Sequence, residues 1–534
     1  MAVKTYVIDN NESRVPFFGD KMSFVTGLDP LGLQNPSVKT YTHLLPGLNN
    51  VTGQIRNYSF YCWLLGEYAK EISSTDKNEQ KSFIRKAEYV IALISKLGSI
   101  DGISGGNYAT NRIAEGDTYN LDTGIFNADG TTINTYWQYG FGIFGQYYIG
   151  SLRQIGLIDE PKDEQGNILG IYRRTAKVDE AIVSGEDLAK AFEAAVDSNA
   201  REQFLAIVRN QTTVSRPELL ALVPHFNLRQ LNIEDTEWEL LIQLLLSNDN
   251  PNQNNEEATS FRKQTIIQLL NFANEQDAEI YDRAFTTFAY NQKGTRKGQA
   301  DECLTGWYYY QFNDYWQIAC TAILNGCLSV LETEKGPAWM NLQELLEVCF
   351  TRVEGLLSAD DKVRWSSTFT IKKIAIDYTE YELYQSIANG VESERLYYGF
   401  LLVFKVFQTN LENLEDLKRY AESYALNSNY DAFSYYSSKS TDETFVLSEF
   451  FKRFLHNNVL NLHQLVAYRK MGGGNQSTQK FIIDEGLIRQ IDNFEPGFTG
   501  PRIGNLIAFL NDLRLLNETG ELTQEGQNIL SSQK

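Results

Sequence analysis

SLRQIGLIDE (Ser151–Glu160), followed by SGEDLAKAFE (Ser184–Glu193), forms a pattern that returns as AFLNDLRLLNETGELTQEGQNIL (Ala508–Leu530). In both copies an amphipathic helix is expected to end in a pair of large aliphatic residues. An acidic turn, a short extended segment and a helix led by glycine follow. The equivalent positions are the pairs Leu152/Leu510, Ile155/Leu513, Leu157/Leu515, Ile158/Leu516, Gly185/Gly526 and Leu188/Ile529. The sequence therefore predicts one small folding unit that occurs twice.

This order of a helix, a β-hairpin and a closing helix resembles the winged-helix family, over about residues 134–197 and 494–532. Winged helices bind DNA or dock on other proteins, so the resemblance implies that basic side chains of the two units contact a partner. These side chains are Arg153, Arg173, Arg174 and Lys177 in the first unit, and Arg502 and Arg514 in the second. They are sparse compared with the roughly six or more phosphate contacts of firm DNA binding. Docking on a protein is therefore favoured over binding to DNA.

The composition of the 534-residue chain is that of a globular protein, with 43% hydrophobic and 22% charged residues. Only 11 prolines occur, which favours long helices over a loop-rich β architecture. The net charge of −20 disfavours a broad nucleic-acid footprint, although it leaves room for a local basic patch. We therefore expect a mainly α fold: a multi-helix body with two winged-helix-like units, one near the N-terminal third and one at the C-terminus.

Hydrophobic periodicity predicts helices over about 51–72 and 79–97 and through most of 198–246, 260–425 and 444–470. A Gly- and Asn-rich stretch between them, about 98–132, predicts a long loop or a set of small hairpins, and 247–258 predicts a linker. A turn and a short strand are expected after residue 470. The predicted division is 1–133 (helical, with the Gly/Asn-rich loop), 134–197 (first winged-helix-like unit), 198–246 (helical), 259–470 (helical body) and 471–534 (second winged-helix-like unit).

Two glycine motifs invite a catalytic interpretation that their surroundings do not favour. Gly140–Gly145 matches G-x-G-x-x-G, but no hydrophobic strand precedes it, so close packing is expected instead of dinucleotide binding. Gly102–Gly106 matches G-x-S-x-G, but a helix precedes it and an Asn-rich loop follows, so a glycine turn is expected. The five cysteines lack a C-x-x-C pair and are expected to be buried, reduced thiols.

Two aromatic runs, 57–68 and 306–317, place rings on several faces of their helices. The first interpretation is a thick helix-bundle core, because aromatic side chains bury large areas. The alternative is a surface that stacks on a ligand or partner, formed by Tyr58, Tyr61 and Trp63 with Arg56 as the charged companion.

These observations lead to three hypotheses about function. The first is a non-enzymatic helical adaptor or sensor subunit of a bacterial multiprotein complex, of the genome-defence or DNA-processing kind, which docks protein partners through the two units. The second is a winged-helix DNA-binding regulator. The third is a metal-dependent nuclease with carboxylates near Asp377 and Glu380, or at Asp360 and Asp361. The first hypothesis includes no cofactor, no metal, no membrane segment and a cytoplasmic location.

Overall fold

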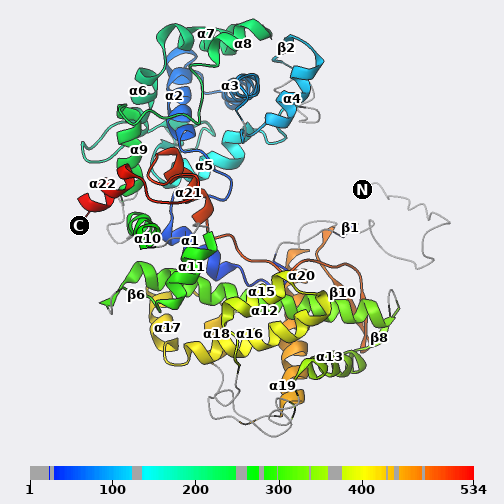
Figure 1. The fold of residues 1–534 in the computed structure, drawn as a ribbon. Coiled ribbons are helices and arrows are strands. Elements are labelled where there is room, and N and C mark those ends of the chain that lie inside the picture. The colour runs from blue at the N-terminus through cyan, green and yellow to red at the C-terminus, as the bar shows by residue number, and fades with distance from the viewer. Residues whose placement is uncertain are drawn as a thin grey trace, which may run out of the picture. The chain divides into compact units, whose positions relative to one another are not determined.

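The computed structural model describes residues 23–24, 29–100, 102–122, 135–247, 261–275, 282–296, 299–335, 338–358, 362, 376–428, 431–437, 444, 446–471 and 476–533. Helices dominate these residues and the strands are short, so the protein is mainly α, as predicted. The chain divides into two compact units (Figure 1). Unit 1 comprises Met1–Pro36 and Phe312–Phe498, and unit 2 comprises Ser37–Gln311 and Thr499–Lys534. Each unit combines two segments that are far apart in the sequence, whereas the division predicted above consists of five consecutive parts.

Unit 2 contains most of the shorter helices and three small antiparallel strand pairs. Its helices are α1 (Asn35–Leu44), α2 (Arg56–Glu71), α3 (Lys77–Leu97), α4 (Gly106–Glu115), the π-helical turn η1 (Phe144–Tyr148), α5 (Ile149–Gln154), α6 (Gly185–Ala195), α7 (Ser198–Asn210), α8 (Arg216–Leu222), α9 (Thr236–Leu246), α10 (Arg262–Glu275), α11 (Asp282–Asn291), α21 (Ile503–Asp512) and α22 (Gln524–Ser532). The strand pairs are β2 (Thr118–Asn120) with β5 (Thr213–Ser215), β3 (Ile158–Asp159) with β4 (Arg173–Arg174), and β6 (Thr295–Arg296) with β7 (Gln299–Ala300).

The core of unit 2 forms around α2, which packs against α3 and α6 (Figure 1). Every residue of α2 from 56 to 68 is buried, so this part of the helix has no exposed face. The Trp63 ring lies 5.3 Å from that of Phe192, and the rings of Phe204 and Phe226 stack at 4.5 Å. Such pairs contribute about 0.5–1.5 kcal/mol beyond their burial. The first aromatic run therefore lies in a core, as the packing interpretation predicted.

Helix α3 has clear start and stop signals. The Asp76 side chain accepts a hydrogen bond from the Asn78 N–H at the first turn, and Gly98 ends the helix. The sequence pattern predicted one apolar face, but residues 83–95 are buried on all sides of the helix. Three charged side chains, including Glu88, are buried with them and need internal partners.

The prediction for the Gly- and Asn-rich stretch was wrong in part, because a helix forms inside it. Gly105, in the left-handed region at φ +78°, precedes α4, and a Cβ at this position would lie 2.9 Å from the Tyr136 ring. Strand β2 then pairs with β5, which lies far along the chain. Residues 123–134 and the predicted linker beyond Ser247 lie outside the described residues.

Unit 1 is a helical bundle with a small sheet. Its elements are α12 (Glu302–Lys335, which begins in unit 2), α13 (Leu342–Leu356), α15 (Glu380–Asn389), the 3₁₀ turn η3 (Glu392–Glu394), α16 (Arg395–Asn410), α17 (Leu414–Ser423), α18 (Ala432–Ser437), α19 (Leu447–Phe454), the π-helical turn η4 (Leu455–Leu460) and α20 (Asn461–Lys470). Strands β10 (Phe481–Asp484), β11 (Leu487–Gln490) and β8 (Met340–Asn341) form an antiparallel sheet, and β1 (Ser23–Phe24) pairs in parallel with β9 (Gln476–Ser477).

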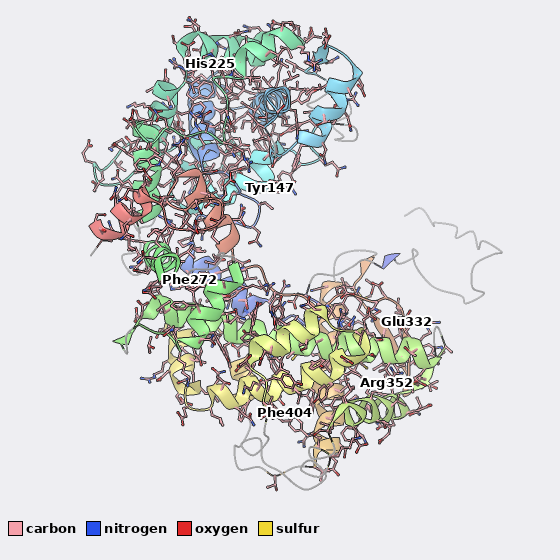
Figure 2. All side chains as sticks on the ribbon, viewed as in Figure 1. Tyr147, His225, Phe272, Glu332, Arg352 and Phe404 are labelled. Atoms are coloured by element: carbon pink, nitrogen blue, oxygen red, sulfur yellow. The ribbon has the colours of Figure 1, made fainter. Side chains whose placement is uncertain are left out.

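Aromatic side chains also fill the bundle of unit 1. Phe404, labelled in Figure 2, lies 4.8 Å from Phe400 on the same helix and 5.3 Å from Phe450 of α19. His463 is fully buried and joins two distant segments: the Lys480 N–H donates to Nε2, so Nδ1 carries the proton and donates to the Pro30 carbonyl oxygen. Burial lowers the pKa of His463 to about 4, which suits a neutral structural imidazole.

The five cysteines are buried free thiols, as predicted: Cys62, Cys303, Cys320, Cys327 and Cys349. Burial raises the pKa of the Cys62 thiol to about 12, so the thiolate that nucleophilic chemistry needs is disfavoured.

Candidate functional site

Each copy of the repeated pattern leaves its first helix through a left-handed residue. In the first copy this residue is Gly156 (φ +85°), and the Leu157 N–H after it donates to the Leu152 carbonyl oxygen at 2.8 Å. In the second copy it is Arg514 (φ +55°), and the next N–H donates to the Leu510 carbonyl oxygen, also at 2.8 Å. The two helix ends therefore have the same hydrogen-bonding pattern.

A hairpin follows in both copies, longer in the first than in the second. The first hairpin pairs β3 with β4 and continues beyond them to its turn. One bridge flanks the turn in each copy, Lys162 with Ile168 and Leu516 with Leu522. The equivalent turn glycines also have positive φ, Gly166 at +86° and Gly520 at +81°.

A threonine and a glycine join each hairpin to the helix after it. Thr175 Oγ1 accepts from the Gly185 N–H at 2.9 Å and donates to the carbonyl oxygen of the left-handed residue. Thr523 Oγ1 accepts from the Gly526 N–H at 3.1 Å and makes the same donation. A Cβ on either glycine would lie 2.2 Å from the carbonyl oxygen of the leucine after the left-handed residue. The two stretches thus share one backbone path, and the winged-helix role inferred from it stays a prediction.

We expect Gly526→Ala to lower the free energy of unfolding of unit 2 by about 1–3 kcal/mol, because the added methyl group meets a backbone oxygen. Gly504→Ala in α21 is the matched control: nothing lies within 4 Å of its Cβ position. A helical Gly→Ala change without a clash stabilises by up to about 1 kcal/mol. Urea denaturation of both variants measures the difference, and equal effects would contradict the close approach.

The basic residues predicted for the first unit face acidic residues of the same unit. Arg153 lies 2.8 Å from Glu160, and Arg173 lies 2.7 Å from Asp159 across the hairpin. Lys177 lies 3.2 Å from an Asp187 carboxylate oxygen and 3.6 Å from one of Glu180. Arg173 thus lies on the hairpin, Arg153 on α5 before it and Lys177 in the segment after it, and each has a carboxylate partner.

The other three predicted contact residues differ in exposure. The Arg174 guanidinium packs over Gly66 of α2, at a place where any larger side chain would clash. Arg502 is largely buried, with its guanidinium 4.3 Å from the centre of the Tyr41 ring. Arg514 is exposed at the turn after α21. Of the two predicted residues of the second unit, only Arg514 is therefore placed for an external contact.

The predicted aromatic surface lies inside unit 2. Tyr58 is fully buried, and Tyr61 and Trp63 are 3% and 1% exposed. Arg56 is buried as well and forms an ion pair with Glu237, with Nη2 3.0 Å from Oε2. These four residues therefore form no exposed stacking surface, although Tyr61 does reach the cavity described below.

The carboxylates proposed for a nuclease do not form a cluster in the described residues. Asp377 is exposed, whereas Glu380 is buried at the start of α15. In the part of the chain that the structure describes, no group of three or more His, Cys, Asp or Glu side chains is placed to hold a metal ion. Asp360 and Asp361 lie outside that part.

The segment 46–57, which leads into α2, is held by both copies. Its hydrogen bonds to the first copy run from Gly47 N to Gln154 Oε1 (3.0 Å) and from Asn49 Nδ2 to the carbonyl oxygen of Tyr147, the residue labelled in Figure 2. Its bonds to the second copy run from Arg502 to the Leu48 carbonyl, from Asn505 Nδ2 to the Thr52 carbonyl (3.0 Å) and from Ile55 N to Asp512 Oδ2 (3.1 Å). The Tyr58 ring meets Tyr148 of the first copy and Phe509 of the second edge-on, at 6.1 and 5.5 Å. This segment therefore couples the two copies.

A cavity of about 120 Å³ lies beside the same segment, between α2 and α3. Its polar lining residues are Gln54, Asn57, Tyr61, Glu88, Ser104 and Tyr148, and the others are Val51, Gly53, Phe60, Ile91, Gly102, Ile103, Ile143 and Leu228. Most of these residues are buried, but Val51, Gly53 and Gly102 are exposed and mark its opening.

Two amides form a connected network on the cavity wall. The Asn57 side chain donates to Gln54 Oε1 at 3.2 Å, and Gln54 Nε2 donates to the Gly102 carbonyl oxygen at 3.2 Å. The network ties α2 to the Gly102–Gly106 turn, which is where the G-x-S-x-G match occurs.

The Glu88 carboxylate is buried at the inner end of the cavity and accepts four hydrogen bonds. Oε1 accepts from the Tyr61 hydroxyl (2.9 Å) and the Phe144 N–H (2.6 Å), and Oε2 accepts from the Ile143 N–H (3.0 Å) and the Tyr136 hydroxyl. Burial raises the pKa of Glu88 to about 7, although each of these bonds acts to lower it. The carboxylate thereby binds the N-terminus of the first copy's helix, where a negative charge is favoured.

This contact explains the G-x-G-x-x-G match. Gly142 has a φ of +67°, and a Cβ there would lie 2.1 Å from Glu88 Oε2. Gly142 and Gly145 therefore serve close packing, in agreement with the sequence prediction, whereas a Cβ at Gly140 would make only ordinary contacts. The Glu88 carboxylate lies where a dinucleotide phosphate would not be tolerated. Glu88, Gln54 and Asn57 were not among the residues predicted from the sequence. The available signal was an acidic residue within the apolar run of α3.

The chain matches no family model, and comparisons with curated proteins and with solved structures found no match. In the described residues, none of the helices has the length and apolar character needed to cross a membrane.

Proposed function

We propose that the protein is a non-enzymatic adaptor or sensor subunit of a bacterial multiprotein complex, and that it docks a protein partner through the hairpin of the first copy. Exposed aliphatic side chains on this hairpin carry the proposal. Ile168, beside the turn, is 59% exposed, and Val178, in the segment before α6, is 78% exposed. Exposed apolar groups within a polar rim are characteristic of surfaces that bind proteins.

Charge supports a protein partner over DNA. The ion pairs of Arg153, Arg173 and Lys177 with neighbouring carboxylates would have to be exchanged before phosphates could bind. DNA binding depends on cations that can replace condensed counterions, and the chain's net charge of −20 adds a general repulsion. The DNA-binding regulator remains the alternative proposal, carried by Arg174 and Arg514.

The test co-expresses the full chain with the products of its neighbouring genes and measures complex mass by light scattering after size-exclusion chromatography. We expect a complex of defined stoichiometry, weakened at least tenfold by Ile168→Asp with Val178→Asp. Leu220→Asp, at a leucine of α8 that is 46% exposed and lies outside both copies, is the matched control. Two results together would favour the regulator: failure to find a partner, and salt-sensitive duplex binding that Arg174→Ala and Arg514→Ala weaken. Metal-dependent nuclease turnover by the pure chain would overturn the proposal.

A further inference from the structure

The cavity between α2 and α3 has polar groups that ordinary core packing does not require. Protein interiors keep few voids larger than a water molecule, because each void forfeits van der Waals contacts. Here about 120 Å³ is kept open next to a densely packed aromatic core. Two amides, three hydroxyls and a carboxyl group converge on it, whereas cavities that stay empty are apolar, so this cavity is suited to water or to a polar ligand.

The lining determines the charge of a suitable ligand. No Lys, Arg or His lines the cavity, and Glu88 lies in its wall, so an anion would be repelled. A cation would need free carboxylate lone pairs, but four donors already occupy the Glu88 oxygens. The hydrogen bonds of Gln54 and Asn57 to each other and to Gly102 leave Asn57 Oδ1 as an acceptor and the second Gln54 Nε2 hydrogen as a donor. The matching ligand is neutral and carries donors and acceptors side by side.

The size and the walls of the cavity determine the shape of the ligand. A cavity of about 150 Å³ holds one benzene molecule, so this smaller cavity takes a single six-membered ring, whose small substituents can extend toward the opening at Val51, Gly53 and Gly102. The rings of Phe60, Tyr61 and Tyr148 line one part, and Ile91 and Leu228 line another. Flat apolar walls with an amide edge fit a planar heterocycle.

We propose that this cavity binds a small neutral heterocycle with an amide or imide edge, recognised by Asn57 and Gln54. Because the segment 46–57 forms part of the cavity wall and also contacts both repeated copies, an occupied cavity would hold this segment in place. The inference does not depend on the docking function, and its test does not use a partner protein.

The experiment titrates the full chain with three compounds by ligand-observed NMR and calorimetry: uracil, the anionic analogue orotate, and benzene. We expect saturable binding of uracil to one site, with a dissociation constant on the order of 0.1 mM. Orotate and benzene should bind at least about tenfold more weakly than uracil, because orotate carries a negative charge and benzene lacks a polar edge. Absence of uracil binding, or equal binding of benzene or orotate, would overturn the proposal.

Two variants locate the site. Asn57→Leu removes the recognising amide, and Ser104→Trp places a large ring at the half-buried rim, where it disturbs the core little. Each should weaken uracil binding about tenfold or more. Thr75→Trp, in the exposed loop between α2 and α3, is the control and should bind as the native chain does. Unchanged binding in Ser104→Trp would place uracil elsewhere and reject the cavity.

Discussion

We expect the Glu237→Gln variant to lose about 3–5 kcal/mol of the free energy of unfolding of unit 2, which makes it one of the most damaging single-atom changes in the chain. The carboxylate is 1% exposed and accepts from Nε and Nη2 of Arg56 at 3.0–3.2 Å, and Ser59 donates to it as well. The glutamine amide keeps the shape of the Glu237 carboxylate but removes its negative charge. The buried guanidinium then loses its counterion and faces an N–H group.

Hydrogen–deuterium exchange of α2 and α9 peptides across a urea series measures this loss, since it reports on unit 2 separately from unit 1. Glu239→Gln is the matched control, on the exposed side of the same helix two residues away. Its effect should stay within about 0.5 kcal/mol. The double variant Arg56→Met with Glu237→Gln should recover part of the loss, because no buried charge is left unpaired. A control that is as damaging as Glu237→Gln would contradict the argument.

Arg56 also shows why the sequence misplaced the candidate site. Its position beside an aromatic run suggested a charged companion for a ligand. Its partner Glu237 is 181 positions away, and nothing local marks the pair. An arginine inside a helix that is apolar on all faces does indicate that a buried partner exists. The identity of that partner follows only from the folded structure, in which Glu237 of α9 contacts Arg56 of α2.

The repeated pattern could be recognised because its signals are local. The left-handed turn and the leucines on each side of it depend on residues a few positions apart, so equal spacing appears in both copies. The Thr–Gly bond could not be found in the same way. Residues 176–184 separate Thr175 from Gly185, whereas only residues 524–525 separate Thr523 from Gly526. A loop of any length can close the same bond, so the spacing in sequence does not reveal it.

The mainly α fold class was also predictable, because it depends on hydrophobic periodicity and the scarcity of proline. The cavity was not predictable. Its walls come from two helices, two turns and the start of a third helix, and only long-range packing brings these together. The glycines at 102–106 and 140–145 marked places of close approach. They did not show that an amide network or the Glu88 carboxylate approaches them.

We expect Glu88 to make the native chain less stable as the pH rises from about 4.5 to about 7. The pKa of this carboxyl is about 7 in the folded protein, against 4.5 for an unperturbed side chain. Between these values the folded state holds a proton that the unfolded state has released. Stability therefore falls with rising pH across this window and is level above it. The contribution of Glu88 is about 3 kcal/mol in total. Asp512, whose pKa burial raises to about 7, acts in the same direction.

Glu88→Gln removes this dependence, because glutamine does not titrate. The variant should be less stable than the native chain at pH 5, since the amide N–H₂ must face two of the four donors that surround the carboxylate. The gap between the two chains should then narrow by about 3 kcal/mol by pH 8, because only the native chain pays for ionisation. The α3 peptides, followed by hydrogen exchange at each pH, give this gap directly.

Glu79→Gln, in the exposed first turn of the same helix, controls for the general effect of removing one negative charge from a chain with a net charge of −20. Parallel stability profiles for the native chain and Glu88→Gln would mean that Glu88 keeps the same charge from pH 5 to pH 8. Its four hydrogen bonds would then outweigh its burial. If the stability difference between the two chains narrows as the pH rises, burial is the larger effect on the pKa of Glu88. The N-terminus of the first copy's helix is then held by a group that changes its charge near neutral pH.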